Sequence, residues 1–378
     1  MNFDYNEEQQ LLAASVKRFV DKDYTFEARE KIVASNEGYS EAIWSTFAEI
    51  GLLGLPFSPD AGGFGGSAVD LMSVMEAIGE ALVVEPYLST VGLGAQFVAR
   101  AGTDAQRQTL LPPVVDGKLK VAFAQTENGA RYNLAHVATR ARSTSEGYAI
   151  SGEKRIVIHA PCADKLIVSA RTSGDDTDPD GISVFVVDAR APGVTMRVYR
   201  TIDQLRAADV LLKDAHVSAD ALIGQEGRGL ALVEEVIDYA TALLCAEAVG
   251  AITYANDATL EYLKTRKQFG APIGSFQALQ HRMVDMVISG EQAKSMASLA
   301  CAKVDSASDP VERKRIVSAA KIEIADACRH VAQEAIQLHG GMGMSDELKI
   351  SHTFRRLTMI AQQFGDADYH LERFAKAS

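Results

Sequence analysis

The hydrophobic pattern divides the chain into three regions. Up to about residue 112, apolar residues recur every three or four positions, which is the spacing of amphipathic helices. From about 115 to 222 the pattern changes to short runs rich in Val, Ile and Phe, bounded by Gly, Asp and Pro. Helical spacing returns after Gly229. We therefore predict an α+β protein with an N-terminal helical domain (1–114), a middle antiparallel β domain (115–224) and a C-terminal four-helix bundle (225–378).

The strongest local patterns predict individual elements inside these regions. Strand-like runs that follow one another without intervening helices indicate a sandwich or barrel. The clearest strands are Val121–Ala124, Tyr148–Ile150, Arg155–Ile158, Lys165–Val168, Ile182–Val187 and Val210–Leu212. The clearest C-terminal helices lie near 230–265, 275–303, 311–338 and 352–376. The acidic segment Gly174–Gly181 is predicted to be a solvated hairpin loop, because Gly, Asp and Pro favour turns.

Composition and charge narrow the class of protein. With 378 residues the chain is too long for a single core, and 47% hydrophobic with 23% charged residues is ordinary for a soluble globular protein. No apolar run is seen to approach the ~20 residues that span a bilayer, and the acidic N-terminus resembles no targeting segment, so we expect a cytoplasmic protein. A net charge of −12 disfavours nucleic acid and anionic membrane as partners. The four cysteines lack the spacing of a zinc site, and no metal is expected.

Several motifs resemble the acyl-CoA dehydrogenase family. The most specific is Tyr262-Leu-Lys-Thr-Arg-Lys-Gln-Phe-Gly270, which continues as Pro272-Ile-Gly-Ser-Phe-Gln277. The resemblance covers essentially the whole chain. The other matching segments are Gly51–Pro56 with Gly62–Gly66, Ala122-Phe-Ala-Gln-Thr-Glu127, Ile150-Ser-Gly-Glu-Lys154 and Gln337-Leu-His-Gly-Gly-Met-Gly343. Within the family, Arg131–Val137 and Phe364–Leu371 are most similar to the small subunit of pimeloyl-CoA dehydrogenase.

The resemblance implies FAD as cofactor, bound between the β domain and the C-terminal bundle, with its pyrophosphate held by a neighbouring subunit. Arg266 matches the pyrophosphate-binding arginine, and a guanidinium can pair two phosphate oxygens at once. Gln268 and Phe269 follow it onto the dinucleotide. Gln337 and Gly341 match a second strip beside the adenosine, where a glycine lets the backbone approach a ligand closely. An exposed Arg and a helix C-cap are the purely structural alternatives.

The half of the predicted site that faces the flavin ring departs from the family pattern. Phe123, Gln125 and Thr126 match the residues that line the ring. The usual Pro-x-Ala-Gly-Ser-Asp continuation is replaced by Asn128–Asn133, which removes a serine that helps to position the ligand. Ile158 occupies the position of a Thr or Ser, and an isoleucine cannot supply the hydroxyl that bonds flavin N5.

The sequence also lacks the family's catalytic base. The family reaction removes an α-proton from an acyl-CoA thioester with a carboxylate while a hydride leaves the β-carbon for the flavin. Phe364 stands where most members have the catalytic Glu, and Ala240 stands where a smaller group has it. The nearby carboxylates are Asp366, Asp368 and Asp238. Asp366 is the weak candidate for a base, and an N-cap of the last helix is its structural alternative.

Three hypotheses follow. The first is a subunit of a heteromeric acyl-CoA dehydrogenase whose homologous large subunit supplies the catalytic Glu. The second is a self-sufficient homotetramer with a relocated carboxylate. The third is a flavin-free structural or acyl-CoA-binding homologue. The sequence does not identify the acyl chain of the substrate, because apolar side chains on several helices shape such pockets and one sequence does not show which of them point inward.

Overall fold

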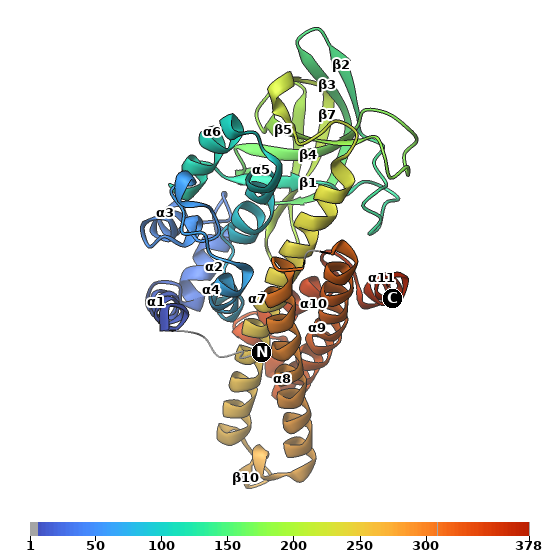
Figure 1. The fold of residues 1–378 in the computed structure, drawn as a ribbon. Coiled ribbons are helices and arrows are strands. Elements are labelled where there is room, and N and C mark those ends of the chain that lie inside the picture. The colour runs from blue at the N-terminus through green and yellow to red at the C-terminus, as the bar shows by residue number, and fades with distance from the viewer. Residues whose placement is uncertain (1–6, 308, 378) are drawn as a thin grey trace. The chain divides into compact units, whose positions relative to one another are not determined.

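The computed structural model describes residues 7–307 and 309–377, and its chain divides into two compact units (Figure 1). Unit 1 comprises residues up to Lys31, Ser67–Val83 and Thr241 onward, whereas unit 2 comprises Ile32–Gly66 and Val84–Ala240. Unit 1 is helical, and unit 2 contains the main sheet. The predicted fold class is confirmed: helices precede a mainly antiparallel sheet, and long helices follow it.

The N-terminal region forms six α-helices and three short helical turns. The α-helices are α1 (Glu7–Asp23), α2 (Phe26–Ala34), α3 (Glu41–Glu49), α4 (Ala68–Ala81), α5 (Ala95–Ala101) and α6 (Asp104–Val115). The turns are η1 (Leu52–Gly54), η2 (Pro59–Ala61) and the π-helical η3 (Leu88–Gly94). Thr103 begins α6 with a capping box, in which its hydroxyl accepts from the Gln106 N–H and the Gln106 side chain accepts from the Thr103 N–H.

The main sheet has eight strands in the order β6-β7-β3-β2-β4-β5-β8, with β1 beside β4. Its strands are β1 (Val121–Ala124), β2 (Arg140–Thr144), β3 (Gly147–Ile158), β4 (Lys165–Arg171), β5 (Ile182–Asp188), β6 (Val194–Arg200), β7 (Arg206–Ser218) and β8 (Leu222–Ile223). Most pairings are antiparallel, but β1 runs parallel to β4. The acidic segment joins the antiparallel strands β4 and β5, so it is a hairpin loop as predicted.

Two of the longer strands, β2 and β6, and the two-residue strands β8, β9 (Lys267–Gln268) and β10 (Ala271–Pro272) were not expected from the sequence. β2 is mostly polar and β6 is an edge strand with mainly exposed or half-buried side chains, so neither has the apolar run of a buried strand. Conversely, two predicted runs fuse into the single strand β3, which stays continuous through register shifts after Ile150 and after Lys154. Such bulges place an extra residue in one strand and leave no separate signal in the hydrophobic pattern.

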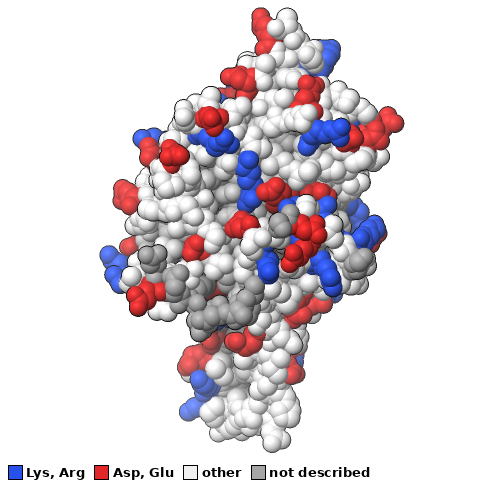
Figure 2. All heavy atoms as spheres, in the orientation of Figure 1, with Lys and Arg blue, Asp and Glu red and all other residues white. Residues whose placement is uncertain are grey.

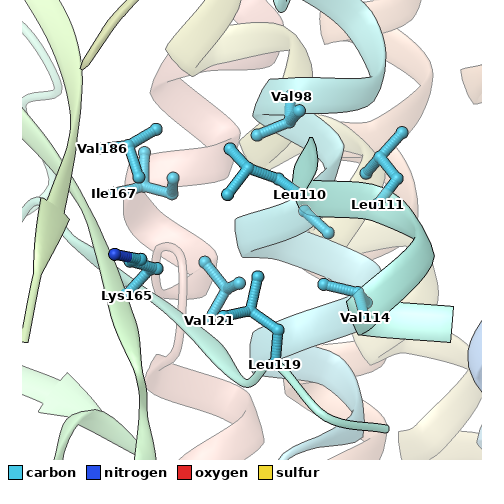
Figure 3. A pocket seen from close by; sticks show the side chains of 10 residues that line it. Val98, Leu110, Leu111, Val114, Leu119, Val121, Lys165, Ile167 and Val186 are labelled. Atoms are coloured by element: carbon cyan, nitrogen blue, oxygen red, sulfur yellow. The ribbon is translucent and has the colours of Figure 1, made fainter. Parts of the chain in front are cut away.

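Apolar side chains of α5 and α6 pack against β1, β4 and β5 within unit 2. Side chains from α5 and α6 meet Val121, Ile167 and Val186 of the sheet, with the Lys165 side chain beside them (Figure 3). The void that these side chains enclose measures only about 10 Å³, which is room for a single water at most. This interface is therefore closely packed and offers no space for a ligand.

The C-terminal region consists of long helices and a small hairpin. They are α7 (Gly229–Thr265), the two-stranded β9 (Lys267–Gln268) and β10 (Ala271–Pro272), α8 (Gln277–Val304), α9 (Pro310–His339), α10 (Lys349–Gln362) and α11 (Ala367–Lys376). Three helical turns, η5 (Ala219–Ala221), η6 (Ile273–Ser275) and η7 (Gly340–Met344), connect elements. The predicted helix over 352–376 was wrong: Phe364 and Gly365 both have positive φ and divide it into α10 and α11.

Helix α7 corrects a second expectation. Among the described residues it alone is long and apolar enough to cross a membrane, whereas the sequence was taken to contain no such run. Of its most apolar window, 94% is buried inside the protein, as in the core helix of a soluble fold. Cys245 on α7 is buried, like Cys301 and Cys328, whereas Cys162 is half-buried, and all four cysteines are free thiols. On the face drawn in Figure 2, acidic and basic side chains are interspersed.

Candidate functional site

The predicted pyrophosphate arginine lies at the tip of α7, in unit 1. Helix α7 ends at Thr265, and the Arg266 N–H still donates to the Tyr262 carbonyl at 2.8 Å. The chain then turns through the β9–β10 hairpin, where Phe269 has positive φ and is 92% exposed. Arg266 and Gln268 are exposed as well. Among the described residues the Arg266 guanidinium makes no hydrogen bond or ion pair, so its donors remain available to a ligand.

The second predicted strip lies beside this tip. Tyr262, four residues before Arg266, stacks on the ring of His339 at 4.4 Å between centroids and 26° between planes. His339 lies between Gln337 and Gly341, so the stack brings both strips to the same end of the bundle. Burial lowers the pKa of His339, and its Nδ1 is 2.8 Å from the Ala335 carbonyl. The imidazole is therefore neutral at pH 7, with an N–H on Nδ1 for that carbonyl.

Neither close packing nor backbone conformation within the chain requires a glycine at position 341. A Cβ built on Gly341 meets no heavy atom within 4 Å, and no positive φ requires glycine there. Gly340, by contrast, has φ +61, a conformation that costs an L-residue energy. Gln337 is exposed beside them. A ligand that approaches from outside this chain would need open space over the backbone. Gln337 and Gly341 therefore fit the adenosine side of FAD.

The ring-lining strip, as we name the residues predicted to face the flavin ring (Phe123, Gln125 and Thr126), lies at the end of β1, in unit 2. Phe123 is largely buried and contacts the Phe97 ring at 4.5 Å, whereas Thr126 is exposed. The Thr126 carbonyl accepts from the Arg155 N–H at 2.7 Å, so the structure brings this strip beside the bulge of β3. The Gln125 side chain donates to the Leu134 carbonyl at 3.0 Å, while its buried Oε1 accepts no hydrogen bond from the described residues.

The residue predicted to face flavin N5, Ile158, pairs with Ala207 on β3, just after the bulge between Lys154 and Val157. Ile156 has φ +52, which is an outlier for a β-branched residue, and its side chain is 53% exposed. Its N–H donates to the buried Asp209 carboxylate at 3.2 Å, and Tyr199 Oη donates to the same group at 2.8 Å. Ile158 is half-buried and packs against a cluster of Val33, Val84 and Leu205. That packing accounts for an apolar side chain at position 158.

A buried ion pair lies directly behind the strip. Lys154 is completely buried, and its ammonium donates to Glu127 Oε1 at 2.6 Å, Ser169 Oγ at 3.0 Å and the Gln125 carbonyl at 3.3 Å. All three of its N–H donors thus have acceptors. Burial lowers the pKa of Lys154 to about 8, and the Lys154 charge with several hydrogen bonds holds the pKa of Glu127 below its usual value. The pair is ionised at pH 7.

Neither predicted base position carries a proton acceptor. Phe364 lies between α10 and α11 with φ +60, and its carbonyl accepts from His370 Nε2 at 3.1 Å. The buried Lys321 donates to the Ala361 and Gly365 carbonyls at 3.2 and 2.8 Å, which holds the same turn from α9. Ala240 is fully buried on α7. A phenyl ring and a methyl group cannot remove a proton.

The three nearby carboxylates have other surroundings. Asp366 is the N-cap of α11, because its Oδ1 accepts from the Tyr369 N–H at 2.9 Å, so the structural alternative is confirmed. Asp366 and Asp368 also line a cavity of about 340 Å³ among α9, α10 and α11. Asp238 is buried on the N-terminal part of α7, within unit 2. A catalytic role for these three residues stays a prediction.

Sequence reasoning did not single out the buried charges. Besides Lys154 and Glu127, the Arg356 guanidinium donates to Glu247 at 2.6 Å inside unit 1, and Arg171 is buried in unit 2. Charged residues are mostly exposed, and a single sequence offers no sign of which are buried. The Glu127 and Lys154 positions lie inside matching motifs, but their pairing across 27 residues needed the folded strands.

Comparison with known proteins decides the family. The chain matches the sequence models of the acyl-CoA dehydrogenase N-terminal domain over residues 6–118, middle domain over 122–215 and C-terminal domain over 227–378. It is 30% identical to the probable acyl-CoA dehydrogenase YngJ of Bacillus subtilis, over 100% of this chain and 99% of that protein. The chain belongs to the acyl-CoA dehydrogenase family. It is therefore an oxidoreductase of the type that acts on CH–CH bonds.

Solved structures agree with this assignment. In the ChsE4–ChsE5 complex of Mycobacterium tuberculosis, a chain 26% identical matches with a TM-score of 0.89 over 100% of this chain and 98% of the other. PigA with FAD and proline, 27% identical, matches with a TM-score of 0.91 over 100% and 98%. The fold and the flavoprotein class are thus those of this family, whose cofactor is FAD. The exposed Arg266 and the open Gly341 backbone fit that cofactor.

Proposed function

We propose that this chain is one subunit of a heteromeric acyl-CoA dehydrogenase. In this proposal it contributes Arg266, Gln268, Phe269, Gln337 and Gly341 to a bound FAD, and a homologous partner contributes the catalytic carboxylate. The observation that carries the proposal is the contrast between the predicted dinucleotide-binding residues and the two base positions. The residues predicted to hold the dinucleotide are exposed and make few contacts within the chain, whereas both base positions are apolar.

The chemistry explains why a partner is needed. Dehydrogenation takes a proton from the α-carbon of the thioester and a hydride from the β-carbon, and FAD supplies the hydride acceptor. A positioned base contributes roughly 10²–10⁴-fold to such a proton transfer. Phe364 and Ala240 can supply none of this. What the chain itself can do is bind phosphate through Arg266 and line the flavin ring with Phe123, Gln125 and Thr126.

Two structural relatives with two different chains support this proposal. One structural relative is the ChsE4–ChsE5 complex, a structure of two different chains. Another relative, 29% identical with a TM-score of 0.86, is the Tcur3481–Tcur3483 steroid enzyme. The similarity of Arg131–Val137 and Phe364–Leu371 to pimeloyl-CoA dehydrogenase small subunits points the same way.

The test compares the chain alone with the chain co-expressed with homologous proteins from its own genome. Flavin content is measured first, and anaerobic bleaching of the flavin by acyl-CoAs of several chain types is measured next. We expect little bleaching with the isolated chain and rapid bleaching with its partner. The activity of the complex should survive Asp238→Asn, Asp366→Asn and Asp368→Asn made together.

The rival is a self-sufficient enzyme with a relocated base, and one observation favours it: Asp366 and Asp368 line a cavity. Rapid bleaching by the isolated chain, abolished by either Asp→Asn substitution, would establish this rival and end the heteromer proposal. A chain that takes up no flavin, alone or with any partner, would instead indicate a structural homologue.

A further inference from the structure

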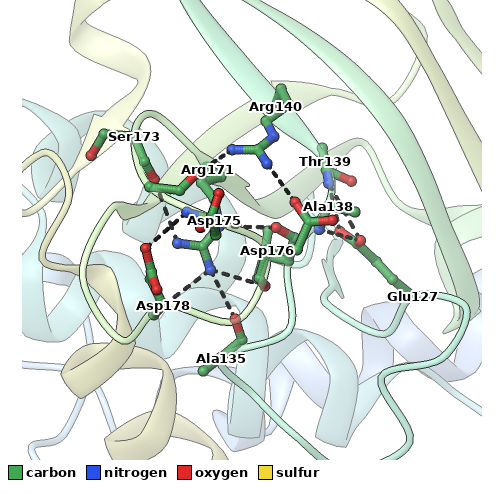
Figure 4. Close-up of polar contacts among 12 residues, drawn as sticks. Glu127, Ala135, Ala138, Thr139, Arg140, Arg171, Ser173, Asp175, Asp176 and Asp178 are labelled. Carbon is green, nitrogen blue, oxygen red and sulfur yellow. Dashed lines mark hydrogen bonds and ion pairs between the residues drawn. The ribbon is translucent and has the colours of Figure 1, made fainter.

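Arg171, at the end of β4, is a buried arginine whose side-chain hydrogen bonds to the described residues all go to backbone carbonyl oxygens (Figure 4). Its side chain is nearly inaccessible, and Nε donates to the Val137 carbonyl at 3.0 Å. The two terminal nitrogens donate to five further carbonyls: Ala135 at 2.9 Å, Asp176 at 3.1 Å, Asp178 at 3.0 Å, Asp180 at 2.9 Å and Ser173 at 3.5 Å. One side chain therefore joins two separate segments, the loop before β2 and the acidic loop after β4.

The acidic loop is arranged around this cation. Asp176-Thr-Asp-Pro-Asp-Gly181 has the D-x-D-x-D-G alternation of calcium-binding loops. Its carboxylates, however, are engaged elsewhere: Asp176 with Arg140, Asp178 with the Asp175 N–H, and Asp180 with Arg228. The described residues contain no group of three side chains that could hold a metal. The loop's carbonyls thus converge on the protein's own guanidinium.

A second buried charge fixes the other side of the loop before β2. Glu127 accepts from the Ala138 N–H at 2.6 Å and the Thr139 N–H at 3.1 Å. The Val137 N–H donates to the Asp176 carbonyl at 2.8 Å, which ties this loop directly to the acidic loop. Gln125, in the ring-lining strip, donates to the Leu134 carbonyl. The segment 128–137 is consequently held at several points although it contains no helix or strand.

We propose that Arg171 is a positioning residue for the ligand site: through the Ala135 and Val137 carbonyls it fixes the segment 128–137, which continues from the ring-lining strip. This inference rests on the proposed function, because that strip is assigned to the flavin by family resemblance. Arg171 lies on β4 and acts through the backbone it holds, so it touches no reacting atom. The segment is a fixed wall of the site, and no lid motion is required of it.

The experiment compares Arg171→Met with Arg171→Lys and Arg140→Met in the full-length chain. Arg140 is the matched control, since it is an exposed arginine that bonds the same acidic loop at Gly174 and Asp176. Hydrogen exchange is measured first without added ligand. In wild type the Val137, Ala138 and Thr139 amides should exchange as slowly as strand amides. Exchange over 133–139 and 173–181 should rise at least about 10-fold in Arg171→Met, less in Arg171→Lys, and little in Arg140→Met, because buried hydrogen bonds set amide protection.

Ligand affinity is measured second, as FAD retention and acyl-CoA binding by the complex. Dissociation constants should rise about 10-fold in Arg171→Met and stay within about 2-fold in Arg140→Met, following the exchange order. Fast exchange of 133–139 in wild type would overturn the proposal, as would unchanged exchange in Arg171→Lys if Arg171→Met fails to fold. Mobile loops with unchanged ligand affinity would make Arg171 merely structural. A wild-type chain that exchanges slowly yet binds no flavin with any partner would refute the proposed function and leave the loop measurement valid.

Discussion

At the scale of single residues, replacing Arg266, whose side chain bonds to none of the described residues, is the most direct test of the dinucleotide assignment. Arg266→Ala should sharply reduce FAD retention in the holo-complex, because a bidentate charged hydrogen bond to phosphate is worth roughly 1.5–3 kcal/mol, or about 10- to 150-fold in affinity. Flavin absorbance after gel filtration measures the retention. The neighbouring exposed Lys267→Ala is the control and should retain flavin. Equal retention in both variants would remove Arg266 from the site.

The buried pair behind the ring-lining strip gives a stability prediction. Lys154→Met leaves the Glu127 carboxylate buried without its cation, and breaking a buried pair in this way costs about 3–5 kcal/mol. Urea unfolding of the full chain measures the loss. Lys118→Met removes an exposed pair with Asp116 and should change stability by less than about 1 kcal/mol. A Lys154→Met variant as stable as the control would show that the pair contributes little.

At the scale of elements, the turn between α10 and α11 depends on a neutral histidine. Burial and the charges of Lys321 and Arg373 lower the pKa of His370 to about 3, and its Nε2–H holds the Phe364 carbonyl. The unfolded chain binds that proton near pH 6.5, whereas the folded chain does so only near 3. Stability therefore falls as the pH drops through this window and is fully present above it.

The variant His370→Gln tests whether His370 causes this loss of stability at low pH. Between pH 7 and pH 5 the histidine accounts for up to about 2 kcal/mol of lost unfolding free energy, and the variant should lack that loss. Denaturant unfolding at both pH values gives the difference. His216→Gln, at an exposed histidine of β7, should lose stability on acidification as wild type does. A pH response in His370→Gln equal to that of His216→Gln would mean that His370 is not the group responsible.

At the scale of the whole molecule, the exposed apolar residues of the C-terminal helices predict that chains associate into oligomers. Val284, Val287 and Ile288 form an outward stripe on α8, each between 42% and 54% exposed, and the exposed Phe269 lies at the tip of α7. Apolar side chains grouped in this way are typical of protein interfaces. A site that takes its phosphate arginine from a neighbouring subunit also needs such an interface, so dimers or tetramers should persist at low concentration.

Ile288→Asp should therefore shift the assembly toward monomer by at least about 10-fold in dissociation constant, since a charge buried at an interface costs several kcal/mol. Analytical ultracentrifugation over a concentration series measures it. Val311→Asp on α9 is the control, because Val311 is equally exposed (50%) but lies apart from the stripe in sequence. A wild-type monomer that binds FAD tightly would contradict the interface and the shared site together.

Local chemistry in the sequence determined most elements and the family. Periodicity gave α7, α8 and α9 to within a few residues, because a buried helix face repeats every 3.6 residues whatever it packs against. The motif around Arg266 and the absence of a carboxylate at Phe364 could also be read from the sequence, because each depends only on which residue type stands at a fixed spacing. The edge strand β6 could not be predicted from the hydrophobic pattern, because an edge strand need not be apolar.

Tertiary structure alone decided which charges are buried and what they hold. Arg171, Lys154 and Lys321 look like ordinary surface cations in the sequence, yet each is buried among carbonyl oxygens or paired across the fold. The break at Phe364 likewise depends on Lys321 and His370, contributed by α9 and α11. The contacts that hold this break join residues 6 to 44 positions apart, and no periodicity in one segment encodes the partner that another segment will bring to it.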